Sequence, residues 1–240
     1  MEHMNRPTNL SDLAYQKLKT LIIRGDIQQG EVVSIVYLSG LLQLGRTPTS
    51  IACQRLECDG LMRIIPKQGL LINPLTINDA RDLYESRCAI EIFADRNSFD
   101  LLDDEDVQIL EGLIAKQTDA GDRNDAYGFM ELDTAWHLHI LKKQPNLILA
   151  SLLNNLTDRI FIFGIRNSFI NQRLRNAIKE HQELINLIQD NNKSGFITHL
   201  EHHIMNGFFT LMGAYEFVDG RKWPIIMPVD NSNKSENNGH

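Results

Sequence analysis

The sequence predicts a mainly α-helical protein in which an N-terminal winged helix-turn-helix is followed by an all-helical antiparallel bundle of about six helices. Three observations support this fold class. Residues 11–72 combine short helical patterns with two brief apolar runs, residues 77–216 keep a helical spacing of apolar side chains, and residues 221–240 are rich in Asn, Ser, Lys and Gly. We therefore expect a winged-helix domain over 1–75, a helical domain over 76–220 and a disordered tail over 221–240.

The first domain contains the predicted order helix, helix, turn, helix and hairpin. Helical spacing of leucines and isoleucines predicts helices over 11–25 and 34–43. A third helix is expected to begin with Thr47 as its N-cap and Pro48 in its first turn, and to stop at Gly60. A helix of this size fits the major groove of DNA, with base edges near its N-terminus.

Two short apolar runs, residues 61–65 and 70–72, are separated by the sequence Pro-Lys-Gln-Gly and predict a β-hairpin. The pattern alone also suits an ordinary helical hairpin beside a β-ribbon. Residues 24–73 further resemble the N-terminal domain of the GntR family of bacterial transcription regulators. The matching residues are Gly25, Gly30, Arg46, Pro48, Leu56, Gly60, Leu61 and Gly69. The resemblance implies that this domain binds double-stranded operator DNA.

The same resemblance implies DNA contacts from the third helix and the hairpin. The expected residues are Arg46, Thr47, Thr49, Ser50, Arg55, Lys67 and Gly69. The chain departs from the family pattern at Gly45, where a serine is usual, and at Ser50, where an arginine is usual. The missing arginine removes a cation that could contact phosphate or guanine, so we expect an unusual base preference.

Charge is distributed unevenly along the 240 residues, whose net charge is −7. Residues 1–75 hold eight Lys and Arg against six Asp and Glu, a balance of +2, and the remaining residues hold sixteen against twenty-five, a balance of −9. A weakly positive DNA-binding domain predicts that two copies act together in a homodimer. The chain lacks an apolar run of membrane-spanning length and a signal-peptide pattern, and its three cysteines form no CxxC. We therefore expect a cytoplasmic protein without a membrane partner.

In the second domain, polar residues at turns separate the helical patterns, and Thr76 with Asp79 predicts a capping box at its start. Helices are expected over 77–99, 104–120, 123–143, 147–166, 170–190 and 194–216. Four polar residues occupy positions where the helical spacing calls for apolar ones: Asp133, His137, His181 and His203. Burying each without a partner would cost on the order of a few kcal/mol. A shared divalent cation, such as Zn²⁺, Ni²⁺ or Mn²⁺, would explain all four, whereas a single buried His is more often a hydrogen-bonded core residue.

Residues 78–216 resemble the FCD ligand-binding domain of the FadR-type branch of GntR regulators, through the stretches DTAWHLHILKKQPN and EHQELINLI. The resemblance implies that the Asp and three His named above bind a metal, and six helices are closer to the VanR-like subgroup. Arg87 matches an arginine that faces the cavity in such domains, so we expect it to bind the carboxylate of a small organic acid. Arg159 and Arg166 are weaker cavity candidates. The other candidate imidazoles, expected at the surface, are His139, His199 and His202, of which His199 is close enough in sequence to support His203.

Together these patterns predict a DNA-binding transcription regulator whose helical domain senses a small metabolite, a carboxylic acid, at a metal site. Two alternatives remain open at this point. A metal with open positions can activate water, so one alternative is a metal-dependent hydrolase. The sequence has no HExxH motif and no Ser or Cys nucleophile constellation, so we do not expect an enzyme. The other alternative is a DNA-binding protein whose bundle only dimerises.

Overall fold

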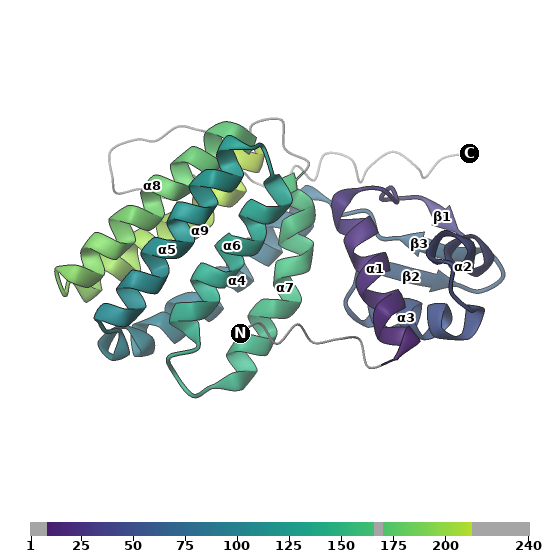
Figure 1. Cartoon of the computed structure of the whole chain (residues 1–240), viewed down its shortest axis with the longest axis horizontal. Helices are drawn as coiled ribbons and strands as arrows, with labels where there is room; N and C mark the ends of the chain where they lie inside the picture. Colours follow the sequence, from purple (N-terminus) through teal and green to yellow (C-terminus); the bar gives the residue numbers. More distant parts are fainter. Residues whose placement is uncertain (1–8, 166–169, 213–240) are drawn as a thin grey trace, which may run out of the picture.

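The computed structural model describes residues 9–165 and 170–212 (Figure 1). Within these residues, three helices and a small sheet form an N-terminal unit, which we call the head, and helices α4–α9 form a second unit, the bundle. This confirms the predicted fold class. Residues 1–8, Arg166 and the tail that was expected to be disordered lie outside the described residues.

The head consists of α1 (Leu10–Arg24), β1 (Val32–Val33), α2 (Ile35–Leu42), α3 (Arg46–Cys58), β2 (Met62–Ile65) and β3 (Gly69–Ile72). Helices α1 and α2 begin at side-chain N-caps, because Asn9 accepts from the backbone N–H of Asp12 and Ser34 accepts from that of Tyr37. Each cap satisfies a backbone donor that the first helical turn leaves without a partner.

Helix α3 begins earlier than the sequence suggested. Gly45 is its N-cap, Arg46 is its first helical residue, and Thr47 and Pro48 follow within the first turn. The prediction of Thr47 as the N-cap is therefore wrong. Proline signals only the first turn, because none of the N–H groups there has an intrahelical partner. The hydroxyl of Thr49 donates to the carbonyl of Gly45 at 2.9 Å, which helps to hold this helix start.

The three strands form an antiparallel sheet in the order β1-β3-β2. The β2–β3 hairpin was predicted, with Ile64 opposite Leu70, but β1 was not, because two residues carry no detectable periodicity. Gly69 has a φ of 130°, and a Cβ there would lie 2.7 Å from the carbonyl oxygen of Val33. The close approach of β1 therefore requires glycine at the start of β3.

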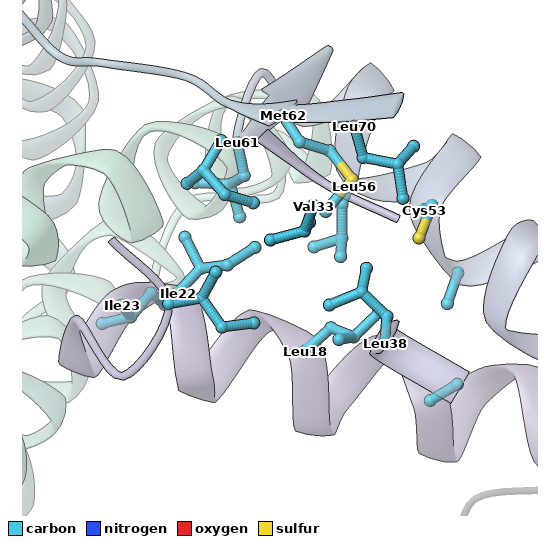
Figure 2. Packing of buried hydrophobic residues seen from close by; sticks show 14 of the residues in the cluster. Leu18, Ile22, Ile23, Val33, Leu38, Cys53, Leu56, Leu61, Met62 and Leu70 are labelled. Atoms are coloured by element: carbon cyan, nitrogen blue, oxygen red, sulfur yellow. The ribbon is translucent and has the colours of Figure 1, made fainter. Parts of the chain in front are cut away.

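The head is built around a core that α1, α2, α3 and the sheet share (Figure 2). Leu18, Leu38 and Leu56 are fully buried in it. Two side chains of this core, Phe161 and Ile162, come from α7 of the bundle. Not every apolar residue of α2 and α3 faces this core, since Leu41 is 46% exposed and Ile51 is 43% exposed. These helices instead turn Leu42, Ala52 and Cys53 inward.

The bundle consists of α4 (Ile77–Ser98), the 3₁₀ turn η1 (Phe99–Leu101), α5 (Asp104–Asp122), α6 (Ala126–Leu141), α7 (Leu147–Ile165), α8 (Ile170–Gln189) and α9 (Lys193–Met212). The capping box of Thr76 and Asp79 is present. Helix α6 begins three residues later than expected, because Asn124 has a φ of 55° and Asp125 acts as the N-cap. Among the described residues, no helix combines the length and the apolar content needed to cross a membrane.

Helix α7 lies on the side of the bundle that faces the head, where it packs beside α1 (Figure 1). Lys19 of α1 forms an ion pair with Asp158 of α7 at 2.5 Å. The ring of Tyr127, at the start of α6, packs edge-on against Phe161 and also lies under the guanidinium of Arg24. Head and bundle are therefore joined by charged and by apolar contacts.

Replacement of Gly69 by alanine should lower the free energy of unfolding by about 1–3 kcal/mol, because the new Cβ meets a backbone oxygen at a positive φ. Gly30→Ala is the matched control. Its φ is also positive, at 80°, but a Cβ there would meet nothing within 4 Å. Thermal unfolding followed by circular dichroism should show a smaller loss for Gly30→Ala, and equal losses would contradict the steric argument.

Candidate metal centre

The four polar residues singled out in the sequence meet in the middle of the bundle. Asp133 and His137 lie one turn apart on α6, His181 comes from α8 and His203 from α9. All four are buried, and each offers one ligand atom such that these atoms lie within 4.8 Å of one another. Residues separated by up to seventy positions in the sequence thus form one compact donor cluster.

The three imidazoles direct the same ring nitrogen toward a common centre. The Nε2 atom of His203 is 3.1 Å from Nε2 of His137 and 3.2 Å from Nε2 of His181, and the remaining pair is 3.3 Å apart. Two donors that bind one cation at about 2.0–2.1 Å are themselves roughly 2.9–3.4 Å apart. The spacing of these nitrogens therefore fits a first-row divalent ion.

Asp133 is the most distant member of the cluster. Its Oδ1 lies 3.6 Å from Nε2 of His181, and its Oδ2 lies 3.9 Å from Nε2 of His137. Two groups outside the cluster approach this carboxylate: the side-chain amide of Gln117 donates to Oδ1 at 3.4 Å, and the guanidinium of Arg87 is 3.7 Å from Oδ2. The carboxylate thus adds an oxygen donor to the three nitrogens.

The other ring nitrogen of each histidine lies close to an oxygen atom. Nδ1 of His137 is 2.6 Å from Oε2 of Glu91, an ion-pair contact whose angle falls short of a regular hydrogen bond, and Nδ1 of His203 forms a hydrogen bond of 2.7 Å with Oε2 of Glu180. The partner of His181 Nδ1 is the amide oxygen of Gln117, at 3.1 Å. These acceptors require a proton on each Nδ1, so each neutral ring presents a lone pair at Nε2.

Three lone pairs within 3.3 Å of one another repel, because no hydrogen atom is left to place between them. A cation at their meeting point turns this repulsion into attraction. The donor set of three imidazoles and one carboxylate also matches the ligands that Zn²⁺ and its neighbours prefer. The residues present therefore fit a divalent metal on the basis of their own hydrogen bonding.

The surroundings favour the protonation states that metal binding needs. Burial lowers the pKa of His181 well below its ordinary value, and burial also lowers the pKa of His203 to about 4 despite the neighbouring Glu180. Burial alone would raise the pKa of Glu91, but Arg87 and His137 outweigh it and bring that pKa to about 2. Neutral imidazoles and ionised supporting carboxylates are the states that hold a metal at neutral pH.

Glu180 holds His203 within a network of its own. Its carboxylate also binds Arg173 at 2.7 Å and accepts from the amide of Asn206 at 3.0 Å. Burial alone would raise the pKa of Glu180, but its bond to His203 and the charge of Arg173 lower it to about 2. The guanidinium of Arg173 donates as well to the backbone carbonyl of His203, at 3.1 Å, which fixes α8 against α9.

Arg87 lies beside the metal cluster, buried on α4, and its Nε donates to Oε1 of Glu91 at 2.5 Å. It lines a small cavity together with Glu91, Asp133 and His137. The space in this cavity for the centre of a water molecule is about 10 Å³, which is close to the minimum that one water needs. The expected carboxylate-binding arginine thus faces the cavity but already has a carboxylate partner.

The cluster and its supports have a charge that a metal would reverse. Three carboxylates (Asp133, Glu91 and Glu180) and two guanidiniums (Arg87 and Arg173) give a balance of one negative charge. A further buried carboxyl, Asp95, has a pKa raised well above its ordinary value by burial and by the charge of Glu91, which favours its neutral form. With a divalent cation the balance becomes one positive charge, which favours an anion as the next ligand.

Sequence reasoning missed the groups that hold the ligands: Glu91, Gln117, Glu180, Arg173 and Asn206. A signal for Gln117 existed, because it follows Leu110 and Ile114 on the buried stripe of α5. Trp136 is a further support, because its ring stacks on that of His181 with the centroids 4.3 Å apart.

The weaker candidates lie away from the cluster. Arg159 is 3.9 Å from Asp79 and packs beside Gly60 of the head, so it does not reach the cavity. His139 is half-buried and contacts Asp106 at 2.8 Å rather than being fully solvated. His199 pairs with Glu183 at 2.8 Å, and the support that it was expected to give His203 comes from Glu180 instead.

The candidate DNA contacts divide into two groups. Arg46, Thr47, Ser50 and Lys67 are exposed at the start of α3 or in the β2–β3 turn. Thr49 is fully buried, so its side chain packs inside the head instead of facing outward. Arg55, in the last turn of α3, forms an ion pair with Asp12 at 2.6 Å and lies over the ring of Tyr15. Gly69 shapes the turn through its backbone.

A winged helix-turn-helix head joined to a helical domain with a buried donor cluster is the architecture of a DNA-binding protein. The family model of the FCD domain matches residues 82–206. The chain belongs to the GntR family of helix-turn-helix transcriptional regulators that carry an FCD domain.

Curated relatives agree with this family. The HTH-type transcriptional regulator YdhC of Bacillus subtilis (strain 168) is 26% identical over 202 residues, which cover 83% of this chain and 90% of the relative. The Nta operon transcriptional regulator of Aminobacter aminovorans is 25% identical over 179 residues, 75% of this chain and 83% of that protein. These relatives are transcriptional regulators and not enzymes, as expected from the sequence.

Solved structures show the same fold. E. coli McbR/YncC has a TM-score of 0.74 at 19% identity, with 86% of this chain and 98% of that chain covered. A protein solved as a GntR transcriptional regulator from Rhodococcus sp. RHA1 has a TM-score of 0.72 at 16% identity, with 86% and 99% covered. The arrangement of head and bundle is therefore shared with both solved structures.

Glu180→Gln should weaken metal binding by about 10–100-fold, because an amide oxygen holds the Nδ1–H of His203 less strongly than a carboxylate does. Glu183→Gln is the matched control, since Glu183 lies one turn further along α8 and binds His199 of α9, outside the cluster. Competition with a chromophoric chelator would measure both affinities. The same loss in the two variants would contradict a supporting role for Glu180.

Proposed function

We propose that this regulator senses a small carboxylic acid at a divalent metal held by Asp133, His137, His181 and His203, and that the bound acid changes how the head engages operator DNA. The observation that carries the proposal is the convergence of three imidazole lone pairs, each fixed by an acceptor behind it. A bundle that only dimerised would have no use for such a centre, and its buried polar groups would cost stability.

The chemical class of the effector follows from charge and shape. A divalent cation gives the centre a positive balance, and Arg87 adds a planar guanidinium on the wall of the adjoining cavity. Both features favour a carboxylate, whose two oxygens can contact a metal and a guanidinium together. Because Arg87 is already paired with Glu91, we expect the acid to share this guanidinium instead of replacing its partner.

The donor set also narrows the metal. Imidazole nitrogens suit Zn²⁺ and Ni²⁺, whereas Mn²⁺ prefers oxygen ligands. Three nitrogens and one carboxylate therefore favour Zn²⁺ or Ni²⁺ among the ions first considered. When bound, the ion supplies an electrophilic centre for an anion. The protein's own groups hold the imidazoles in position and keep the site closed to bulk water.

We assign DNA binding to the exposed N-terminus of α3 and to the β2–β3 hairpin, residues 62–72, which we call the wing. Arg46, Thr47 and Ser50 lie where backbone N–H groups and side chains can approach phosphates and base edges. Lys67, at a φ of 64° in the wing turn, provides a second cation. Arg55 is a weaker contact than its sequence position implied, because its charge is already used by Asp12.

We further propose a cytoplasmic homodimer of the VanR-like type. A head with a balance of only +2 makes few phosphate contacts, so two heads on a near-palindromic operator are needed for tight binding. The bundle offers apolar side chains for a second copy, because Phe93 of α4 is 60% exposed and Leu147 and Ile148 of α7 are 78% and 71% exposed.

Arg46→Ala should weaken operator binding by about 1–3 kcal/mol and leave the fold intact, because it removes an exposed cation at the reading end of α3. Ser50→Arg should tighten binding to DNA of any sequence and steepen its salt dependence, because one more phosphate is neutralised. Fluorescence anisotropy over a salt series would measure both effects. Lys116→Ala, on the bundle, serves as the charge-matched control, and a loss as large as that of Arg46→Ala would refute the assignment.

Removal of the metal with a chelator should lower the melting temperature of the protein. A metal whose free concentration is one hundred times its Kd contributes about 2.7 kcal/mol to the free energy of unfolding. Short carboxylic acids should raise the melting temperature of the metal-loaded protein but not that of the protein from which the metal has been removed.

His181→Ala should behave like the metal-free protein because one of few ligands is missing, and its operator affinity should stay near that of the original chain. Metal analysis showing a full complement in His181→Ala would exclude the shared site.

A further inference from the structure

Two hollows in the protein share a wall. The small cavity beside the metal cluster is bounded on one side by Thr134 of α6 and Thr157 of α7. The same two threonines line a larger groove of about 650 Å³ between α1 of the head and helices α6 and α7 of the bundle. Among the residues that the structure describes, this is the only pair of side chains that belongs to both the metal-side cavity and the space next to the head.

The metal-side cavity is too small for the ligand that we propose for the metal centre, whereas the groove is large enough. The metal-side cavity has about 10 Å³ for water centres, so it has room for about one water molecule and not for an organic acid. The groove is within the size range of ordinary small-molecule sites. A carboxylate at the metal must therefore have the rest of its atoms elsewhere, and the groove is the adjoining space.

Opening the shared wall breaks neither of its two hydroxyl hydrogen bonds. The hydroxyl of Thr134 donates to the carbonyl of Met130, and the hydroxyl of Thr157 donates to the carbonyl of Leu153, each at 2.9 Å. Each donated bond lies within one helix, so both survive a small separation of α6 from α7. The hydroxyl oxygens remain able to accept a hydrogen bond from a molecule that passes between them.

The groove is chemically mixed and long. It runs beside α6 from Tyr127 to Lys142, a rise of about 22 Å along the helix axis. Amide and hydroxyl groups are supplied by Gln16 and Thr20 of α1 and by Asn154 of α7. Apolar surface comes from Ile23, Tyr127, Leu138 and Phe161, and the rest of the lining includes charged side chains: Lys19, Glu131, Lys142 and Asp158. Such a lining suits an extended stem that has both carbon atoms and hydrogen-bonding groups.

We propose that the effector is a carboxylic acid with an extended, hydrogen-bonding stem, which passes between Thr134 and Thr157 and lies in the groove against α1. This rests on the proposed function, because it takes the carboxylate to be bound at the metal and Arg87. It adds that the effector touches the DNA-binding head directly, through Gln16 and Thr20. Helix α1 packs on α3, the helix that we propose contacts DNA. An acid that contacts α1 therefore binds one placement of the head better than another, and it raises the population of that placement.

The test uses the zinc-loaded full chain and three acids: acetate, hexanoate and N-acetyldiglycine. Calorimetry should give affinities about tenfold or more above that of acetate for the two acids with stems, with the amide-bearing acid the tightest. Thr157→Met should remove this advantage by filling the wall, while the zinc content stays unchanged. Thr118→Met is the matched control, because the hydroxyl of Thr118 makes the same bond within its helix but lines neither hollow.

The contact with the head is tested separately. Gln16→Ala with Thr20→Ala should weaken N-acetyldiglycine severalfold and leave acetate unchanged, and these exposed or half-buried positions tolerate alanine even if Thr157→Met fails to fold. Acids with stems that bind no better than acetate, or that keep their advantage in the Gln16 and Thr20 variant, would overturn the proposal. If the original chain bound no zinc, or its zinc-loaded form bound no acetate, the proposed metal-dependent function itself would be overturned.

Discussion

The bundle depends on one electrostatic constraint, the convergence of three imidazole lone pairs on a single point. Each ring is kept there by an acceptor from the surrounding helices: Glu91 from α4, Gln117 from α5 and Glu180 from α8. With the ligands on α6, α8 and α9, five of the six bundle helices contribute a polar group to the centre, and α7 closes the cavity beside it. Removing any of these acceptors would free a ring to turn away.

Helix α7 connects this centre to the head through successive side chains. Thr157 and Ile160 face the metal-side cavity, while Asp158, Phe161 and Ile162 contact the head. Because α7 is a rigid helix, a shift of its side chains at the metal-side cavity also shifts its side chains at the head. Coupling between ligand and DNA therefore needs only two alternative positions of α7, each preferred by one bound partner.

Much of this could be read from the sequence, because its strongest signals are local. Apolar spacing predicted the helices, and His137, His181 and His203 stood out as polar residues on apolar stripes. Contacts between distant segments give no such signal. Periodicity did not show that Glu180 rather than His199 supports His203, that a two-residue strand passes Gly69, or that Thr49 turns inward. These depend on which helices face one another, which only the folded chain decides.

The two side chains that α7 places in the core of the head bear on how the protein unfolds. Phe161 and Ile162 are 5% and 2% exposed, and both pack in the cluster that holds α1, α2 and α3 together. A chain that ended after Leu75 would leave an apolar hollow open to water on the face of α1. The two units thus share part of one core, so unfolding of α7 would expose apolar surface of the head that holds the DNA-binding helix.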